Sequence, residues 1–184
     1  MIFGHFLTQA NESNAFVVAC EETKEAMLID VGALHPQLED FLNRHGLRLT
    51  KVFITHDHYD HTGGLDEVVR RFGPEVYAGK TRAGGCKAHK VAHGQELAVG
   101  RLTGTALATP GHTPDGVCIV FPGMVFTGDT LFSGSIGGTS NPSQEIRHIK
   151  EHIFTLPPEY EIHTGHGPSS TVAIESQGNP FFVE

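Results

Sequence analysis

Directly after a short apolar run, the chain reads Thr55-His56-Asp57-His58-Tyr59-Asp60-His61-Thr62-Gly63-Gly64. Three histidines and two aspartates fall within six positions of this segment. Residues two apart in a loop can turn inward together, so His56 and His58 can hold one metal ion while Asp60 and His61 hold a second beside it. Imidazole and carboxylate ligands suit zinc, iron or manganese. The alternative is a histidine-rich surface turn that binds metal only adventitiously.

The segments on either side of this cluster predict a strand before it and a helix after it. Residues 49–55 form an apolar and β-branched run without alternation, which is typical of a strand covered on both faces. Residues 65–72 carry apolar side chains three and four positions apart, which is typical of a helix. The histidine cluster therefore occupies a strand-to-helix loop.

The rest of the chain alternates predicted strands and helices. We expect a β-hairpin from residues 14–20 and 25–30, helices over 36–44 and 143–154, a strand over 75–78 and several short strands over 97–132. Ser143 is the expected N-cap of the last helix. Residues 80–90 lack apolar periodicity and are expected to form an exposed loop. This order is typical of β-sheets with helices on their outer faces.

Length and composition predict one globular domain over residues 1–184, with 39% apolar and 18% charged residues. The net charge of -8 disfavours nucleic acid as a partner and leaves small molecules. No apolar run approaches the roughly 20 residues that cross a bilayer, and the N-terminus lacks a secretion signal, so we expect no membrane partner and a cytoplasmic location. The three cysteines show no paired spacing and are expected to be reduced.

Three further glycine-bounded stretches offer the additional ligands that two metal ions would need. They are Thr109-Pro110-Gly111-His112-Thr113-Pro114, Phe126-Thr127-Gly128-Asp129-Thr130 and His163-Thr164-Gly165-His166-Gly167. With these four motifs in order over residues 55–167, the sequence resembles the metallo-β-lactamase superfamily, and within it the glyoxalase II-like branch.

The resemblance implies an α/β fold, a four-layer αββα sandwich with two divalent metal ions at one edge of its sheets. Zinc is the expected metal, with iron or manganese as alternatives. By resemblance the first metal takes His56, His58 and His112, the second takes Asp60, His61 and His166, and Asp129 bridges both. Asp60 and Asp129 would be the catalytic residues, because Asp60 lies where it could orient the attacking hydroxide.

The implied activity is hydrolysis by a metal-bridging hydroxide, with an anionic thioester of the hydroxyacylglutathione type as the small-molecule substrate. A thiolate leaves more easily than an amine, which favours thioesters over amides. The best-known metallo-β-lactamases replace His61 or lack Asp129, so antibiotic hydrolysis is not the expected main activity. Full-length glyoxalase II enzymes bind glutathione with a C-terminal helical domain, whereas about eighteen residues follow His166 here.

Two other functions stay open at this point. One is a persulfide dioxygenase, an oxidoreductase of the same superfamily that uses one iron and keeps most of this ligand set. The other is a metal-binding or sensing module without turnover. Iron with thiol-dependent oxygen uptake would identify the dioxygenase, and an absence of turnover on both substrate classes would identify the module.

Several charged residues outside the motifs have two interpretations each. Asp57 could orient a ligating imidazole or only brace its loop. His148 and His152 stand four apart on a predicted helix and are expected on its solvated face. The cations of the 80–90 segment could recognise a substrate carboxylate or could simply be solvated; they are Lys80, Arg82, Lys87 and Lys90.

Overall fold

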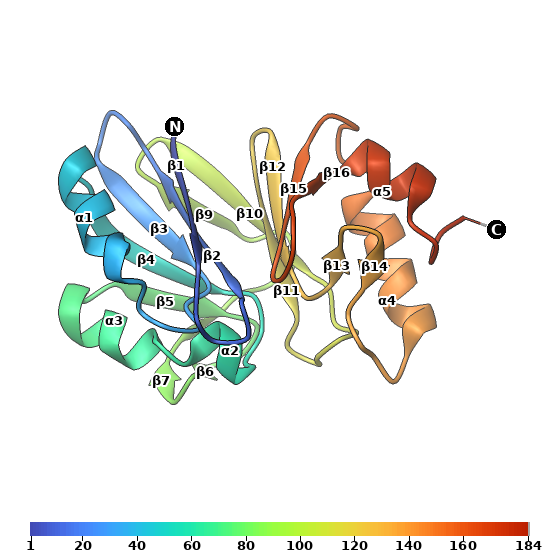
Figure 1. The fold of residues 1–184 in the computed structure, drawn as a ribbon, viewed down its shortest axis with the longest axis horizontal. Helices are drawn as coiled ribbons and strands as arrows, with labels where there is room; N and C mark the ends of the chain where they lie inside the picture. The colour runs from blue at the N-terminus through green and yellow to red at the C-terminus, as the bar shows by residue number, and fades with distance from the viewer. Residues whose placement is uncertain (184) are drawn as a thin grey trace.

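The computed structural model describes residues 1–183 as two six-stranded β-sheets packed face to face, with helices on the outer faces (Figure 1). Helices α1 (Pro36–His45) and α3 (Leu65–Phe72) cover the first sheet. Helices α4 (Pro142–His148) and α5 (Val172–Gly178) cover the second sheet. The four-layer αββα sandwich predicted from the sequence is confirmed.

The first sheet has the order β1-β2-β3-β4-β5-β8. Its strands are β1 (Ile2–Leu7), β2 (Asn14–Ala19), β3 (Glu25–Ile29), β4 (Arg48–Ile54), β5 (Glu75–Ala78) and β8 (His89–Lys90). Strands β3, β4 and β5 run parallel, so their C-terminal ends meet at one edge of the sheet. Alternate side chains point to opposite faces, so Val52 packs under the helices while Phe53 packs between the sheets.

The second sheet has the order β16-β15-β12-β11-β10-β9. Its strands are β9 (Glu96–Val99), β10 (Leu102–Ala108), β11 (Val117–Phe121), β12 (Met124–Gly128), β15 (Glu161–Thr164) and β16 (Ser170–Thr171). Strands β12 and β15 are parallel and end at the same edge as β3 and β4, near the bottom of Figure 1. Phe121 and Phe126 fill the space between the sheets, whereas Val125 and Ile162 pack under the outer helices.

Most predicted elements are present with ends shifted by one or two residues. The predicted hairpin corresponds to β2 and β3, and the predicted helices at 36–44 and 65–72 correspond to α1 and α3. Gly46 ends α1 in the left-handed conformation, with φ at 63°, which glycine adopts at little cost. Strand β1 and helix α5 were not among the predicted elements.

The predicted loop over residues 80–90 was wrong in part. It contains a small hairpin of β6 (Arg82–Ala83) and β7 (Cys86–Lys87), followed by β8. Gly84 and Gly85 both have positive φ and form the turn between the two strands. Strands of two residues are too short to show an alternating pattern, so periodicity could not reveal them.

The last predicted helix begins earlier than expected and changes its winding. Asn141, not Ser143, is the N-cap, and its side chain accepts a hydrogen bond from the Gln144 amide. Pro142 then occupies the first turn, where its missing N–H costs nothing. After α4 the chain continues as the π-helix η1 (Ile149–Ile153). A small hairpin, β13 (Leu131–Phe132) and β14 (Ser135–Ile136), lies between β12 and this helix.

Two further expectations concern the cysteines and the membrane. Cys20, Cys86 and Cys118 are free thiols, as predicted. Within residues 1–183, no helix is long and apolar enough to cross a membrane.

Candidate metal centre

The histidine cluster lies where β4 ends, and its conformation is fixed by close backbone packing. After β4 the chain forms the one-turn helix α2 (Tyr59–Thr62), which presents Asp60 and His61. The Val31 amide donates to the carbonyl of His61 at 2.9 Å. A Cβ atom on Gly32 would lie 1.9 Å from the carbonyl oxygen of Asp60, so only glycine allows this approach.

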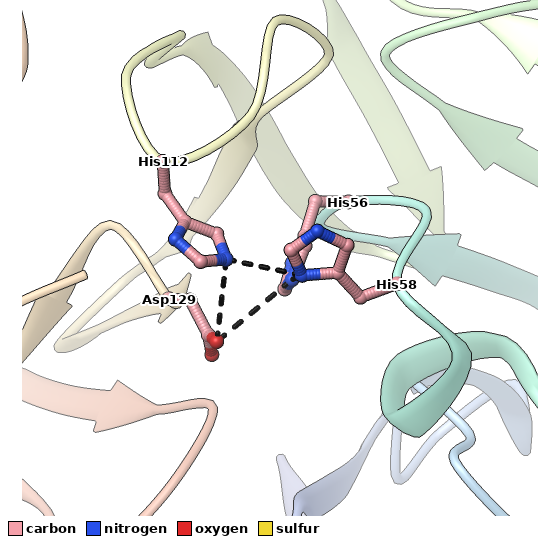
Figure 2. Close-up of side chains that lie close together, drawn as sticks. All are labelled: His56, His58, His112 and Asp129. Atoms are coloured by element: carbon pink, nitrogen blue, oxygen red, sulfur yellow. Dashed lines mark hydrogen bonds and ion pairs between the residues drawn. The ribbon is translucent and has the colours of Figure 1, made fainter. Parts of the chain in front are cut away.

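Four side chains from three separate segments form the first group, which comprises His56, His58, His112 and Asp129 (Figure 2). One possible ligand atom from each lies within 4.8 Å of all the others. Nδ1 of His58 is 3.1 Å from Nε2 of His56 and 3.1 Å from Nε2 of His112. The sequence-predicted residues of the first metal are thus brought together.

Neighbouring acceptors fix the tautomers of two of these imidazoles. Nδ1 of His112 lies 2.8 Å from the carbonyl oxygen of Gly138, which can only accept, so this nitrogen carries the proton. Thr55 donates its hydroxyl proton to Asp30 and is left to accept from Nδ1 of His56. Nε2 of both histidines therefore presents a lone pair toward His58.

Three side chains form the second group, which comprises Asp60, His61 and His166. Nδ1 of His61 donates to Oδ2 of Asp30 at 2.8 Å, and Nδ1 of His166 donates to the carbonyl of Asn11 at 3.1 Å. With Nδ1 of each ring donating, the two Nε2 atoms face each other across 3.3 Å. Oδ2 of Asp60 lies 3.3 Å from Nε2 of His166 and accepts from the Asn11 side chain at 3.1 Å.

Asp129 stands between the two groups and faces both. Its Oδ1 is 3.2 Å from Nε2 of His61, while its Oδ2 is 3.6 Å from Nε2 of His112 and 3.8 Å from Nε2 of His56. Oδ1 is buried and accepts no hydrogen bond from the described residues. The rings of His56 and His61 lie 4.2 Å apart, so the two groups share a border.

The electrostatics of the two groups differ. Burial lowers the pKa of His56 to about 3, and the neighbouring His61 acts in the same direction. Burial alone would also lower the pKa of His61, but the carboxylates of Asp30 and Asp129 outweigh it and raise that pKa to about 10. Burial opposes ionisation of Asp129, yet the imidazole of His61 holds its pKa at about 2.

This donor set fits two cations better than it fits a hydrogen-bond network. Lone pairs that face each other repel unless a cation or proton lies between them. Tetrahedral zinc with bonds of ~2.0–2.1 Å to nitrogen separates its ligands by about 3.3 Å, close to the distances seen here. Imidazoles whose far nitrogens donate to carboxylate or carbonyl oxygens are typical of metal sites.

Two residues that hold these ligands were missed in the sequence. Asp30 directly follows β3 and contacts both His61 and Thr55. It adopts φ of 56°, an uncommon conformation for a residue other than glycine. The sequence did contain one signal for Asp30, which is an acidic residue directly after the apolar run that forms β3. Asn11, in the turn after β1, has no comparable signal because it is 49 positions from Asp60.

Other residues discussed from the sequence take structural places. Oδ1 of Asp57 accepts from the Gly84 amide at 2.6 Å and Oδ2 contacts Lys80 at 2.7 Å, so Asp57 braces its loop. His148 donates to the carbonyl of Pro110 at 2.9 Å. His163 stacks on Phe126 and belongs to neither group of candidate ligands.

Comparison with known proteins gives the same family as the four motifs. The family model described as the metallo-beta-lactamase superfamily matches residues 9–166. A hydroxyacylglutathione hydrolase from Idiomarina loihiensis is 32% identical over 169 residues, which are 88% of this chain and 64% of that enzyme. The chain thus spans less than two thirds of that relative's length.

Two solved structures share the whole fold. ETHE1 from Myxococcus xanthus is 32% identical with a TM-score of 0.86, covering 98% of this chain and 84% of that one. TTHA1623, solved in a di-iron-bound form, is 27% identical with a TM-score of 0.83, covering 97% of this chain and 99% of that one. Fold, motifs and relatives agree: the chain belongs to the metallo-β-lactamase superfamily.

Proposed function

We propose that this protein is a dinuclear metal-dependent hydrolase that cleaves a thioester of the hydroxyacylglutathione type. The observation that carries the proposal is the position of Asp129 between the two groups: Oδ1 faces His61 of the second group, while Oδ2 lies 3.6 Å from Nε2 of His112 in the first group and 3.7 Å from Nε2 of His166 in the second. A carboxylate in that place can hold two cations close together. The di-iron form of TTHA1623, a protein similar along almost its whole length, supports two metals.

The proposed ligands are the seven residues predicted from the sequence. They are His56, His58 and His112 for the first metal, Asp60, His61 and His166 for the second, and Asp129 between them. Two divalent cations, zinc first among the candidates, supply hydroxide at neutral pH and polarise a carbonyl. Imidazole and carboxylate donors without a nearby thiolate also accept iron or manganese.

The residues of the chain then have defined tasks. Asp129 would neutralise part of the charge of two bound cations. Asp60 is held by the Asn11 side chain within the second group, where it could orient the attacking oxygen and accept its proton. Asp30 keeps the lone pair of His61 directed at the site. No serine or cysteine nucleophile is needed.

Thioester hydrolysis is favoured over amide hydrolysis by two observations. The hydroxyacylglutathione hydrolase relative is a thioesterase by name, and it is 32% identical over most of this chain. A thiolate also leaves without prior protonation, so the site needs no general acid beside the leaving group. We further propose an anionic small-molecule substrate and a cytoplasmic location for the enzyme.

A second candidate is persulfide dioxygenase activity with one iron, which the likeness to ETHE1 favours. It requires the group of His56, His58, His112 and Asp129 to bind iron while the second group stays without metal. Because Asp129 lies near ligands of both groups, a site with two metals is better supported than a site with one iron.

The test uses protein purified without added metal, then loaded with zinc, manganese or iron. Metal content is measured first, followed by hydrolysis of S-lactoylglutathione and simpler thioesters, with EDTA-treated protein as the control. We expect two ions per chain, hydrolysis that EDTA abolishes and recovery on reloading. Oxygen uptake with glutathione persulfide and intact thioesters would establish the dioxygenase instead.

A further inference from the structure

The proposed ligands of the first metal come from two loops that are far apart in sequence. His56 and His58 lie after β4, whereas His112 lies after β10, more than 50 positions later. Their nitrogens must stay within a few tenths of an ångström of 3.1 Å for one cation to bind all three. The two loops therefore need a support that fixes one against the other.

One such support lies at the strand ends. The Val117 amide donates to the carbonyl of Thr55 at 2.9 Å, so the strands that carry the two loops are joined by the backbone. Thr55 comes just before His56 in the first loop, and Val117 comes five positions after His112 in the second. The bond between them leaves the parts of the loops that carry His58 and His112 to be held elsewhere.

The segment that follows β5 provides a second support. Nζ of Lys80 lies 2.7 Å from Oδ2 of Asp57 and 3.6 Å from Oδ2 of Asp115. Asp57 separates His56 from His58 in the sequence, and Asp115 is three positions after His112. One ammonium group thus contacts a carboxylate in each ligand loop.

The backbone around Lys80 is fitted to the same two loops. A Cβ atom on Gly79 would lie 1.9 Å from the carbonyl oxygen of Asp115, so the chain passes that loop in direct contact. The Gly84 amide donates to Oδ1 of Asp57, the oxygen that Lys80 does not use. Asp57 is consequently held at both oxygens by the 79–84 segment.

We propose that Lys80 is a positioning residue for the first metal, joining the two ligand loops through Asp57 and Asp115. It touches neither metal nor substrate in this role. Its side chain is 44% exposed, so each ion pair is screened by solvent and the effect is moderate. The inference rests on the proposed metal site, and its test separates the two.

The experiment titrates metal-free protein with Zn²⁺ in competition with a chromogenic chelator and resolves the two binding steps. We expect Lys80→Ala to weaken one step by about three- to tenfold and to leave the other unchanged. Lys80→Arg, which keeps a cation at the same place, should restore affinity to within about twofold of the parent. Lys87→Ala, in the hairpin that follows Lys80, is the matched control and should bind Zn²⁺ as the parent does.

The same substitution made in a second variant, His58→Ala, shows which of the two Zn²⁺-binding steps Lys80 affects. His58→Ala removes the first group, and in that variant Lys80→Ala should leave the remaining Zn²⁺ step unchanged. If Lys80→Ala does not fold, Asp115→Asn breaks the same link from the other loop and should weaken the same step.

Equal affinities for Lys80→Ala and the parent would overturn the proposal, as would equal weakening of both steps. A lower thermal midpoint of the metal-free variant without a change in Zn²⁺ affinity would also overturn it, since that outcome describes a purely structural ion pair. A parent chain that binds no Zn²⁺ would instead refute the metal site itself.

Discussion

His56 and His61 belong to adjacent groups, have rings 4.2 Å apart, and differ in what surrounds them. His56 is buried beside other imidazoles and has a pKa lowered to about 3. His61 is just as buried but lies between the carboxylates of Asp30 and Asp129, which raise its pKa to about 10. The metal-free protein thus keeps His56 neutral and ready to bind, whereas a proton competes with metal for His61.

This contrast predicts an order of loading at neutral pH. A ligand that is already neutral gives up nothing when metal binds, while a protonated ligand must first lose its proton. On this basis the group that contains His56 should take the first ion and the group that contains His61 the second. In the proposed site, the charge of Asp129, which lies near both groups, would allow two ions to stay together.

The largest effect is expected from Asp129→Asn, which would remove the shared charge. An amide cannot offset the repulsion of two close cations, so metal content should fall from two ions per chain toward one and thioester hydrolysis should be lost. Metal analysis after dialysis and a hydrolysis assay measure the two effects. Asp66→Asn, on the exposed face of α3, is the control. Two tightly bound ions with unchanged turnover would contradict the bridging role.

Changing pH should separate the two groups without any substitution. Because the pKa of His61 is raised to about 10, affinity at the second step should increase by on the order of tenfold per unit from about pH 7 to about pH 9. His56 contributes no such dependence in this range because its pKa is about 3. Zn²⁺ titrations at several pH values, in buffers that do not bind the metal, give the slope of each step. If the affinity of both binding steps depended on pH to the same extent, the proposed difference in proton affinity between the two groups would be wrong.

The same pKa predicts how the stability of the metal-free protein depends on pH. The folded-state pKa of His61, about 10, lies above its unfolded value of ~6.5. The folded state therefore binds this proton more tightly than the unfolded state does. The resulting stabilisation is fully present below about pH 6.5 and is lost as pH rises through 10. Urea unfolding of EDTA-treated protein across this range measures it.

Asp30→Asn tests the cause of the contrast and should have the next largest effect. The amide keeps the shape of the carboxylate but carries no charge and has one acceptor oxygen in place of two, so the pKa of His61 should fall. We expect second-step affinity at pH 7 to change by about tenfold, with a weaker pH slope than in the parent. The sign of the change in metal affinity separates two effects of Asp30. Binding weakens if Asp30 mainly orients the His61 ring, and it strengthens if Asp30 mainly holds a proton on His61 that competes with the metal. An unchanged slope would show that Asp30 does not set the proton affinity of His61.

The sequence predicted the parts of this centre that depend on local patterns. The cluster at residues 56–61 follows an apolar run, so its place at a strand end could be predicted from periodicity alone. His112, Asp129 and His166 were found because each lies in a glycine-bounded loop of the same kind. The fold followed from the resemblance together with the order of strands and helices.

The supports of the ligands could not be predicted in the same way. Asn11 and Asp60 meet because their loops lie at the same edge of the first sheet, and Lys80 and Asp115 meet because the two sheets pack together. No spacing in the chain records either contact. The pKa difference between His56 and His61 likewise depends on Asp30, whose side chain turns inward at a positive φ. Such features require three-dimensional distances between residues that are distant in sequence.

The smallest effect is expected at the cations of the 80–90 segment, which were one candidate for recognising a substrate carboxylate. Lys80 forms ion pairs with Asp57 and Asp115. Arg82 donates a hydrogen bond to the carbonyl of Gly85 within the same hairpin. Lys87 is exposed and lines a hollow with Val69 and Glu75, on the helix side of the first sheet.

Lys87→Ala should therefore change KM for an anionic thioester by less than about twofold at low salt, because a solvated surface charge contributes little. The assay should be repeated at high salt, since screening weakens any contribution of an exposed cation to substrate binding. A several-fold rise in KM that disappears at high salt, with kcat unchanged, would show that this lysine binds the substrate. Substrate recognition would then extend to the hairpin beside the first group, and the two groups would differ in substrate contacts as well as in proton affinity.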